Sequence, residues 1–145
     1  MAKDAFTEEE KQTIVKAVKA AELETSGEIQ VHLENHCKED VMDHAAHIFK
    51  TLKMHKTELR NGVLFYMAVK DHKFAILGDA GINNKVPENF WDDIKEHMLA
   101  HFKKGNLTAG LSEGIKMAGQ QLAEHFPYKK DDQNELPDQI SFGKN

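Results

Sequence analysis

One stretch in the middle of the chain limits the possible folds more than any other. It begins with Arg60-Asn61-Gly62, continues through the apolar run 63–69 and the shorter run 73–77, and leaves through a glycine-rich segment, residues 78–82. The first run is apolar on both alternating faces, so a strand formed there must be covered on both sides. Residues 71–72 would be the tip of a tight hairpin. The stretch therefore predicts a central strand and an antiparallel neighbour.

Helical and strand periodicities surround this hairpin. The expected elements are a helix from the capping box of Thr7 and Glu10 to residues 26–27, a half-covered strand at 28–34 near the sheet margin, a helix after Asp40, a helix whose first turn holds Pro87, and a helix from Thr108 to Phe126. Gly110 and Gly114 are one turn apart, which would let a neighbouring helix approach closely.

This order of elements predicts an α/β fold, a three-layer αβα sandwich with a mixed, partly parallel sheet. A right-handed crossover would make the first two strands parallel. The length of 145 residues suits one domain, residues 1–126, followed by a polar C-terminal tail, residues 127–145. Within the tail, Ile140 and Phe142 leave two alternatives open: a loose tail, or a strap docked by these two side chains.

Composition excludes several classes of protein. The net charge is −5 and lysines alternate with acidic residues, so no basic stripe for nucleic acid is present. No apolar run is long enough for a signal peptide or a membrane span, and Cys37, the single cysteine, cannot form an internal disulfide. We expect a cytoplasmic bacterial monomer that is not inserted in a membrane, and the sequence does not identify a protein partner.

The predicted topology brings the starts of the first two strands and the exit of the third to one edge of the sheet. That edge would gather four oxygen-bearing side chains: Glu28, Asn61, Asp79 and Glu88. Carboxylate and amide oxygens suit a hard divalent cation, whereas glycine N–H groups and a helix N-terminus would suit an anion. Alternatively, Asp79 and Glu88 only cap a turn and a helix. We expect a divalent metal site, with Ca²⁺ as the first choice.

The opposite edge is a rival site, because ligands often bind at the carboxyl ends of parallel strands. It would carry residues 34–37 and the hairpin tip, residues 71–72. The pair His36-Cys37 invites comparison with cysteine phosphatases. However, the run HCKEDVMD has neither the arginine nor the glycines of a phosphate-cradling loop. A small loop thiol is the simpler interpretation of Cys37.

Histidines are numerous, and two pairs have helical spacing: His44 with His47 and His97 with His101. Each pair could share a metal, but HMLAH lacks the glutamate of the zinc-protease motif, and solvated helix histidines are the simpler interpretation. The chain shows no P-loop, Rossmann fingerprint or DxDx[TV] motif.

Four segments together resemble the TPM domain, a family named for thylakoid-lumen, photosystem-repair and receptor-modulating members. The most extensive is RNGVLFYMAVKDHKFAILGDAGI, residues 60–82. TSGEIQVHLE resembles the first strand of the family, VPENFWDDI its helix start, and HFKKGNLTAGLSEGIKMAGQQL its closing helix. The resemblance covers about residues 6 to 126.

The resemblance implies an αβα sandwich and, at its acidic edge, calcium or another metal. Family members are described as an acid phosphatase, as photosystem-repair factors and as modulators of membrane proteins. This chain has Arg60 and Glu88 where the family commonly has aspartate, so a catalytic role is not expected there. We expect an accessory or binding module rather than an enzyme. The alternative is a metal-dependent, acid-phosphatase-like phosphomonoester hydrolase.

Overall fold

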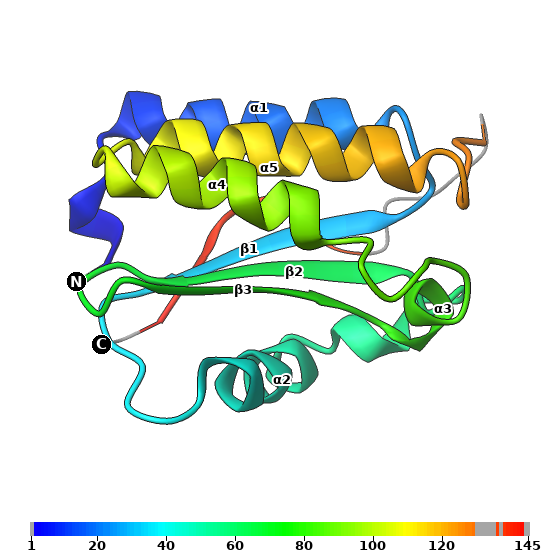
Figure 1. The fold of residues 1–145 in the computed structure, drawn as a ribbon, viewed down its shortest axis with the longest axis horizontal. Helices are drawn as coiled ribbons and strands as arrows, with labels where there is room; N and C mark the ends of the chain where they lie inside the picture. Colours follow the sequence, from blue (N-terminus) through cyan, green and yellow to red (C-terminus); the bar gives the residue numbers. More distant parts are fainter. Residues whose placement is uncertain (1, 130–135, 137, 144–145) are drawn as a thin grey trace.

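Helices pack on both faces of a four-stranded sheet in the computed structural model, which describes residues 2–129, 136 and 138–143 (Figure 1). The strands are β1 (Glu28–Glu34), β2 (Gly62–Ala68), β3 (Lys73–Gly78) and β4 (Ser141–Phe142), in the order β3-β2-β1-β4. β1 and β2 are parallel, and β2 and β3 are antiparallel. The predicted αβα sandwich with a mixed sheet is confirmed.

The helices divide unequally between the two faces. α1 (Glu8–Glu22), α4 (Asp92–Lys103) and α5 (Leu107–Leu122) cover one face, and α2 (Val41–Thr51) covers the other (Figure 1). Three short helices complete the order: η1 (Ala2–Ala5), η2 (Met54–Lys56) and α3 (Ala80–Asn83). None of the helices in the described ranges is both long and apolar enough to cross a membrane.

Local sequence signals place several of these boundaries. Thr7 and Glu10 form the predicted capping box of α1, and the Asp40 carboxylate accepts from two backbone N–H groups at the start of α2. The hairpin between β2 and β3 has no glycine at its tip. His72 adopts the left-handed conformation instead, with φ of 56°.

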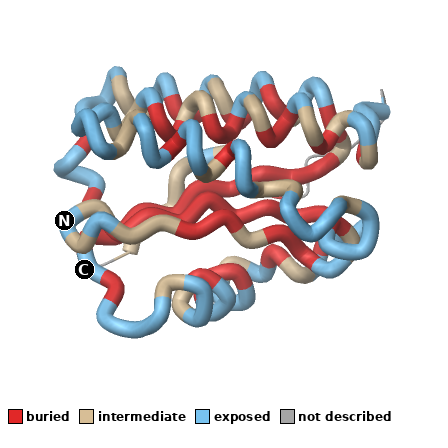
Figure 2. Tube along the Cα trace, in the orientation of Figure 1, coloured by how far each residue is buried: buried red, intermediate tan, exposed pale blue. Residues whose placement is uncertain are grey.

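The sheet separates two apolar cores, as the buried strands in Figure 2 indicate. Val63, Phe65 and Met67 of β2 face the core under α1, α4 and α5, whereas Leu64 and Tyr66 face the core under α2. The glycine-spaced face of α5 packs closely on α4. A Cβ at Gly110 would overlap Phe102 and one at Gly114 would overlap Met98, so the predicted close approach is present.

Several boundaries differ from the sequence predictions. α1 ends at Glu22, before the predicted end at residues 26–27. α4 begins at Asp92 and not at Pro87, because the chain turns through residues 87–91 first. α5 ends at Leu122. The short helix α3, which interrupts the glycine-rich exit from β3, was not expected.

β1 is the largest departure. The alternating sequence predicted a half-covered strand near the margin, yet all seven residues of β1 are buried. Other segments of the chain supply the cover: His44 of α2 and the Leu136 backbone bond Glu34 and Glu28 on the polar face, and Ser141 and Phe142 of β4 pair with His32 and Leu33, parallel to β1. Ile140 and Phe142 pack against the core, so this part of the tail is docked. Residues 130–135, 137 and 144–145 of the predicted tail lie outside the described residues.

Candidate functional site

The predicted metal edge forms at the backbone level. The Glu28 N–H donates to the Asn61 carbonyl at 3.1 Å, and the Asp79 N–H donates to the Gly62 carbonyl at 3.0 Å. The starts of β1 and β2 and the end of β3 therefore lie side by side, as the topology predicted. Glu88 lies apart, exposed in the connection between α3 and α4, and no hydrogen bond or ion pair within the described residues joins it to the other three.

Asp79 has an internal cation as its partner. Arg60 donates to it twice, from Nε to Oδ2 at 2.7 Å and from Nη2 to Oδ1 at 2.8 Å. The Asp79 Oδ1 also accepts the Ala80 N–H at 2.7 Å, so this carboxylate caps α3, as the alternative interpretation supposed. Arg60 has a left-handed backbone, with φ of 52°. A guanidinium thus occupies the place beside Asp79 that a metal ion would need.

Glu28 lies in a different environment. Its side chain is buried, and its Oε1 accepts the Leu136 N–H at 3.1 Å. The neighbouring Glu22 accepts the Ile29 N–H at 3.1 Å. Burial raises the pKa of Glu22 to about 9, and a hydrogen bond with the Asp138 carboxyl adds to the shift, as do the charges of Asp138 and Glu28. Three acidic side chains therefore gather around the start of β1.

The described residues do not hold a preformed metal centre. Within residues 2–129, 136 and 138–143, no three His, Cys, Asp or Glu side chains are arranged to hold a metal ion. The chemistry of the donors nevertheless differs along the edge. Asp79 is neutralised by Arg60, whereas Glu28 lies beside another acid, Glu22, whose carboxyl is hydrogen-bonded to Asp138.

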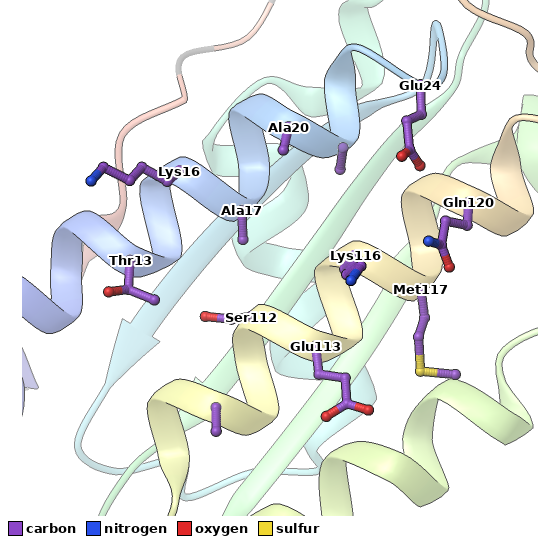
Figure 3. A pocket seen from close by; sticks show the side chains of 12 residues that line it. Thr13, Lys16, Ala17, Ala20, Glu24, Ser112, Glu113, Lys116, Met117 and Gln120 are labelled. Atoms are coloured by element: carbon purple, nitrogen blue, oxygen red, sulfur yellow. The ribbon is translucent and has the colours of Figure 1, made fainter.

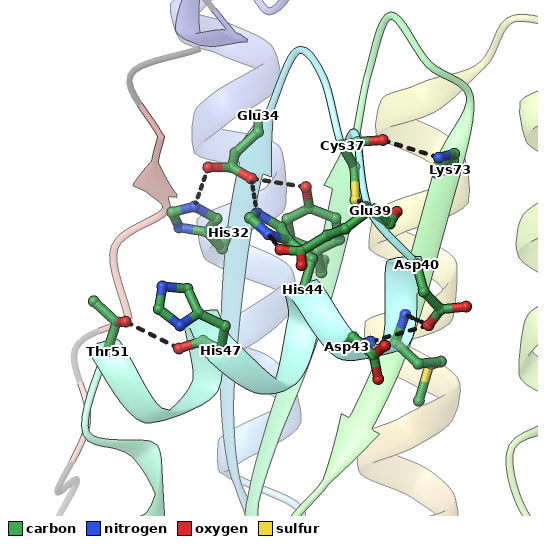
Figure 4. Close-up of polar contacts among 12 residues, drawn as sticks. His32, Glu34, Cys37, Glu39, Asp40, Asp43, His44, His47, Thr51 and Lys73 are labelled. Carbon is green, nitrogen blue, oxygen red and sulfur yellow. Dashed lines mark hydrogen bonds and ion pairs between the residues drawn. The ribbon is translucent and has the colours of Figure 1, made fainter.

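The carboxyl end of β1 carries a denser polar network (Figure 4). The buried Glu34 Oε1 accepts from the Tyr66 hydroxyl and from His44 Nε2, each at 2.7 Å, and His32 Nε2 lies 3.4 Å from Oε2. His44 also bonds Glu39 through Nδ1 at 2.5 Å. An imidazole that bonds an ionised carboxylate through each nitrogen donates from both, so this geometry favours the protonated form of His44.

The pKa values at this end follow from the network. Burial opposes the charge on Glu34, but hydrogen bonds from Tyr66 and His44 outweigh it and lower the pKa of Glu34. Burial likewise opposes the charge on His44, but Glu39 and Glu34 outweigh it and raise the pKa of that imidazole. Burial lowers the pKa of His32 despite Glu34. The network therefore holds an ionised Glu34 in a buried position.

The rival site at this edge is a set of structural contacts. Cys37 is buried, and its thiol donates to the Glu39 carbonyl at 3.3 Å. Asp71 accepts the Cys37 N–H at 2.8 Å and bonds His36 Nδ1 at 2.9 Å. Lys73 Nζ donates to the Cys37 carbonyl at 2.9 Å. These bonds fix the loop after β1 to the hairpin tip.

The helical histidine pairs differ from each other. His97 and His101 both face Glu113 of α5, at 3.5 Å and 2.5 Å, a partner that the sequence reasoning missed although it lies on the neighbouring helix. The ring centroids of His44 and His47 are 6.2 Å apart. His44 bonds Glu34, and no local sequence pattern indicates this contact because the two residues belong to different elements.

An open groove of about 720 Å³ runs between α1 and α5 (Figure 3). Small side chains line its floor, including Ala17 and Ala20. The charged side chains that line it have both signs: Lys16, Glu24, Glu113 and Lys116. The groove therefore has no charge that would select one kind of ligand.

The fold and its two polar ends define a class of protein: an αβα sandwich whose central strands carry charged groups at both ends. The chain belongs to the TPM-domain family, since a model of the TPM domain matches residues 2–121. Comparison with curated protein sequences finds no significant match.

Two solved structures are similar to this chain. The BA42 protein from the psychrophilic bacterium Bizionia argentinensis is 51% identical, with 95% of each chain covered and a TM-score of 0.91. The N-terminal domain of a protein from P. gingivalis is 19% identical, with 83% of this chain and 78% of that chain covered and a TM-score of 0.69. The second likeness supports the fold alone.

Proposed function

We propose that this TPM-domain protein is a binding module that takes up a divalent cation, with calcium as the first choice, at the amino end of β1. The observation that carries the proposal is the gathering of the Glu22, Glu28 and Asp138 carboxyl groups. Burial and neighbouring like charges both oppose ionisation, and a hard cation held by oxygen atoms would relieve both. The cytoplasmic location and monomeric state expected from the sequence belong to the same proposal.

Gln30 supplies a further oxygen donor. It lies two residues after Glu28, on the same face of β1, and its side chain is buried. No described residue donates a hydrogen bond to its Oε1. A buried amide oxygen without a donor is costly in a protein interior, and amide oxygens are ordinary calcium ligands.

The four predicted ligands contribute unequally to this proposal. Glu28 is the central one, and Asn61 is its backbone neighbour. Asp79 could join only if Arg60 released its carboxylate, and Glu88 only if its connection moved toward β1. Ligation by Asp79 and Glu88 therefore remains a prediction, and the proposal depends on Glu28.

The test is a calcium titration followed by backbone amide shifts. We expect perturbations near residues 22, 28–30 and 61, and their loss in Glu28→Gln. Glu24→Gln is the matched control, because it makes the same chemical change on an exposed side chain nearby. About 10 mM calcium is well above the dissociation constants of extracellular calcium modules, so an unchanged spectrum at this concentration would remove the site. Equal binding by Glu28→Gln would move it elsewhere.

The same preparation tests the hydrolase alternative. We expect no turnover of a generic phosphomonoester with or without divalent metals, because the Cys37 thiol is buried and Asp79 is paired with Arg60. Metal-dependent turnover that disappears in Asp79→Ala would replace the binding module by an acid-phosphatase-like hydrolase.

A further inference from the structure

A second cavity lies between the hairpin tip and the turn that joins α4 to α5, at the opposite end of the sheet from the proposed cation site. Its volume is about 330 Å³, at the lower end of the range for small-molecule sites. The wall is apolar and includes Met67, Phe74, Leu99 and Phe102. Phe74 and Phe102 meet edge to face, with ring centroids 5.0 Å apart, and both stay partly exposed. Aromatic surface is thus left open to a ligand.

The charges that line this cavity all have one sign. The titratable side chains among the described residues that line it are Lys73, Lys103 and His72, and none of these lining residues is acidic. The chain as a whole carries a net charge of −5, so a purely basic lining is contrary to its overall balance. Lys103 follows Leu99 by one helical turn, which places a cation and an exposed apolar side chain on the same face of α4.

Two residues with left-handed backbones border the cavity. His72 at the hairpin tip has φ of 56°, and Gly105 in the turn after α4 has φ of 79°. A side chain such as His72 rarely adopts this conformation, and residues held there often belong to binding sites. A tight hairpin and a helix end both use such a residue, so these two conformations fix the shape of the turns that border the cavity.

From the apolar wall and the basic lining, we propose that this cavity binds a small amphipathic carboxylate, such as a medium-chain fatty acid. The alkyl chain lies against Phe74, Phe102 and Leu99, and the carboxylate meets Lys103. Lys73 already donates to the Cys37 carbonyl, so Lys103, which is exposed, is the cation that sets the preference for an anion. The site is separate from the proposed cation site, and either one can fail without the other.

The test is an amide-shift titration with octanoate, compared with octanol as the uncharged control. We expect amide shifts confined to residues near 67–74 and 99–107. The dissociation constant of octanoate should be on the order of 1 mM or below. Lys103→Glu should weaken octanoate binding about threefold to tenfold and leave octanol binding unchanged. Lys104→Glu is the matched control, because it reverses the adjacent exposed lysine, which does not line the cavity.

A second pair of variants tests the apolar wall. Leu99→Gln should weaken the binding of both compounds, whereas Leu23→Gln, at another exposed leucine, should weaken neither. The proposal is overturned if octanoate shifts nothing at about 10 mM, if the shifts spread over the whole surface, or if octanol and octanoate respond alike to Lys103→Glu.

Discussion

Two glutamates at opposite ends of β1 are buried to a similar extent but have different hydrogen-bond partners. Glu28 and Glu34 are 4% and 6% exposed and lie on the same face of the strand. Glu34 meets hydrogen-bond donors from Tyr66 and His44, so its charge is compensated within the protein. Glu28 meets a backbone N–H and, in Glu22, another acid.

The contrast separates a structural charge from a candidate binding group. A buried carboxylate with its own donors needs nothing further and makes the fold more specific. A buried carboxylate beside other acids is harder to ionise, and a bound cation would favour its charged form. The exposed fraction does not distinguish the two glutamates. Their hydrogen-bond partners and neighbouring charges do.

The largest expected effect comes from removing each charge in turn. Glu34→Gln should lower the free energy of unfolding by about 1.5–3 kcal/mol, because charge-assisted hydrogen bonds are lost in a buried network. In the presence of a chelator, Glu28→Gln should leave the free energy of unfolding unchanged or raise it, because the substitution removes a carboxyl group that lies near Glu22. Urea denaturation of both variants measures the difference. If both lose stability equally, the comparison between the two ends is wrong.

The next effect concerns protons released on binding. The pKa of Glu22 is raised to about 9, chiefly by burial and then by Asp138, so Glu22 is protonated at neutral pH. Calcium bound beside it should displace that proton, and affinity should rise about tenfold for each pH unit between neutrality and pH 9. Titration calorimetry in buffers of different ionisation enthalpy counts the protons. A Glu22→Gln variant should bind without this pH dependence.

Stability should respond to pH in different directions at the two ends. A folded-state pKa raised from 4.5 to about 9 means that the contribution of Glu22 is complete below pH 4.5 and is lost as pH rises toward 9. The lowered pKa of Glu34 has the opposite sign, and its contribution is lost as pH falls below 4.5.

Denaturation in chelator from about pH 4 to about pH 9 measures both slopes. Each pKa unit corresponds to about 1.4 kcal/mol, so a loss of at least this size is expected above neutrality. The raised pKa of His44 also removes stability above 6.5, so Glu22→Gln is needed to isolate the part due to Glu22. A slope that survives in Glu22→Gln would assign it to His44 instead.

The smallest effect is at Arg60. Its side chain is half-exposed, so loss of the ion pair with Asp79 in Arg60→Ala should cost about 0.2–1 kcal/mol. Arg60→Gly loses the same ion pair but relieves the left-handed backbone, and should be more stable than Arg60→Ala by about 0.5–1 kcal/mol. Thermal unfolding of the two variants compares them. Equal stability would show that the conformation of Arg60 carries no strain.

Much of the fold could be predicted because local patterns agree with it. The two apolar faces of residues 63–69 required cover on both sides, and a tight hairpin follows from the short gap to residues 73–77. The positions of Gly110 and Gly114 indicated close helix packing for the same reason: a missing side chain is visible in the sequence. These features depend on residues that are near one another in the chain.

The candidate site could be predicted only in part. The topology brought Glu28, Asn61 and Asp79 to one edge, but it could not reveal that Arg60 turns toward Asp79 and not toward solvent. The gathering of Glu22 with Asp138 could not be predicted, because the two residues are 116 positions apart in the sequence. Side-chain direction and distant pairing are set by the packed structure and not by local periodicity.

The pairing of β4 with β1 has a consequence for biosynthesis. His32 and Ser141 are joined across 109 positions of sequence. A ribosome adds about 5–20 residues per second, so the outer edge of β1 stays open for several seconds after its other strand partner, β2, is available. During that time unpaired N–H and C=O groups can pair with another chain. We therefore expect nascent chains of this protein to depend on chaperones until β4 emerges.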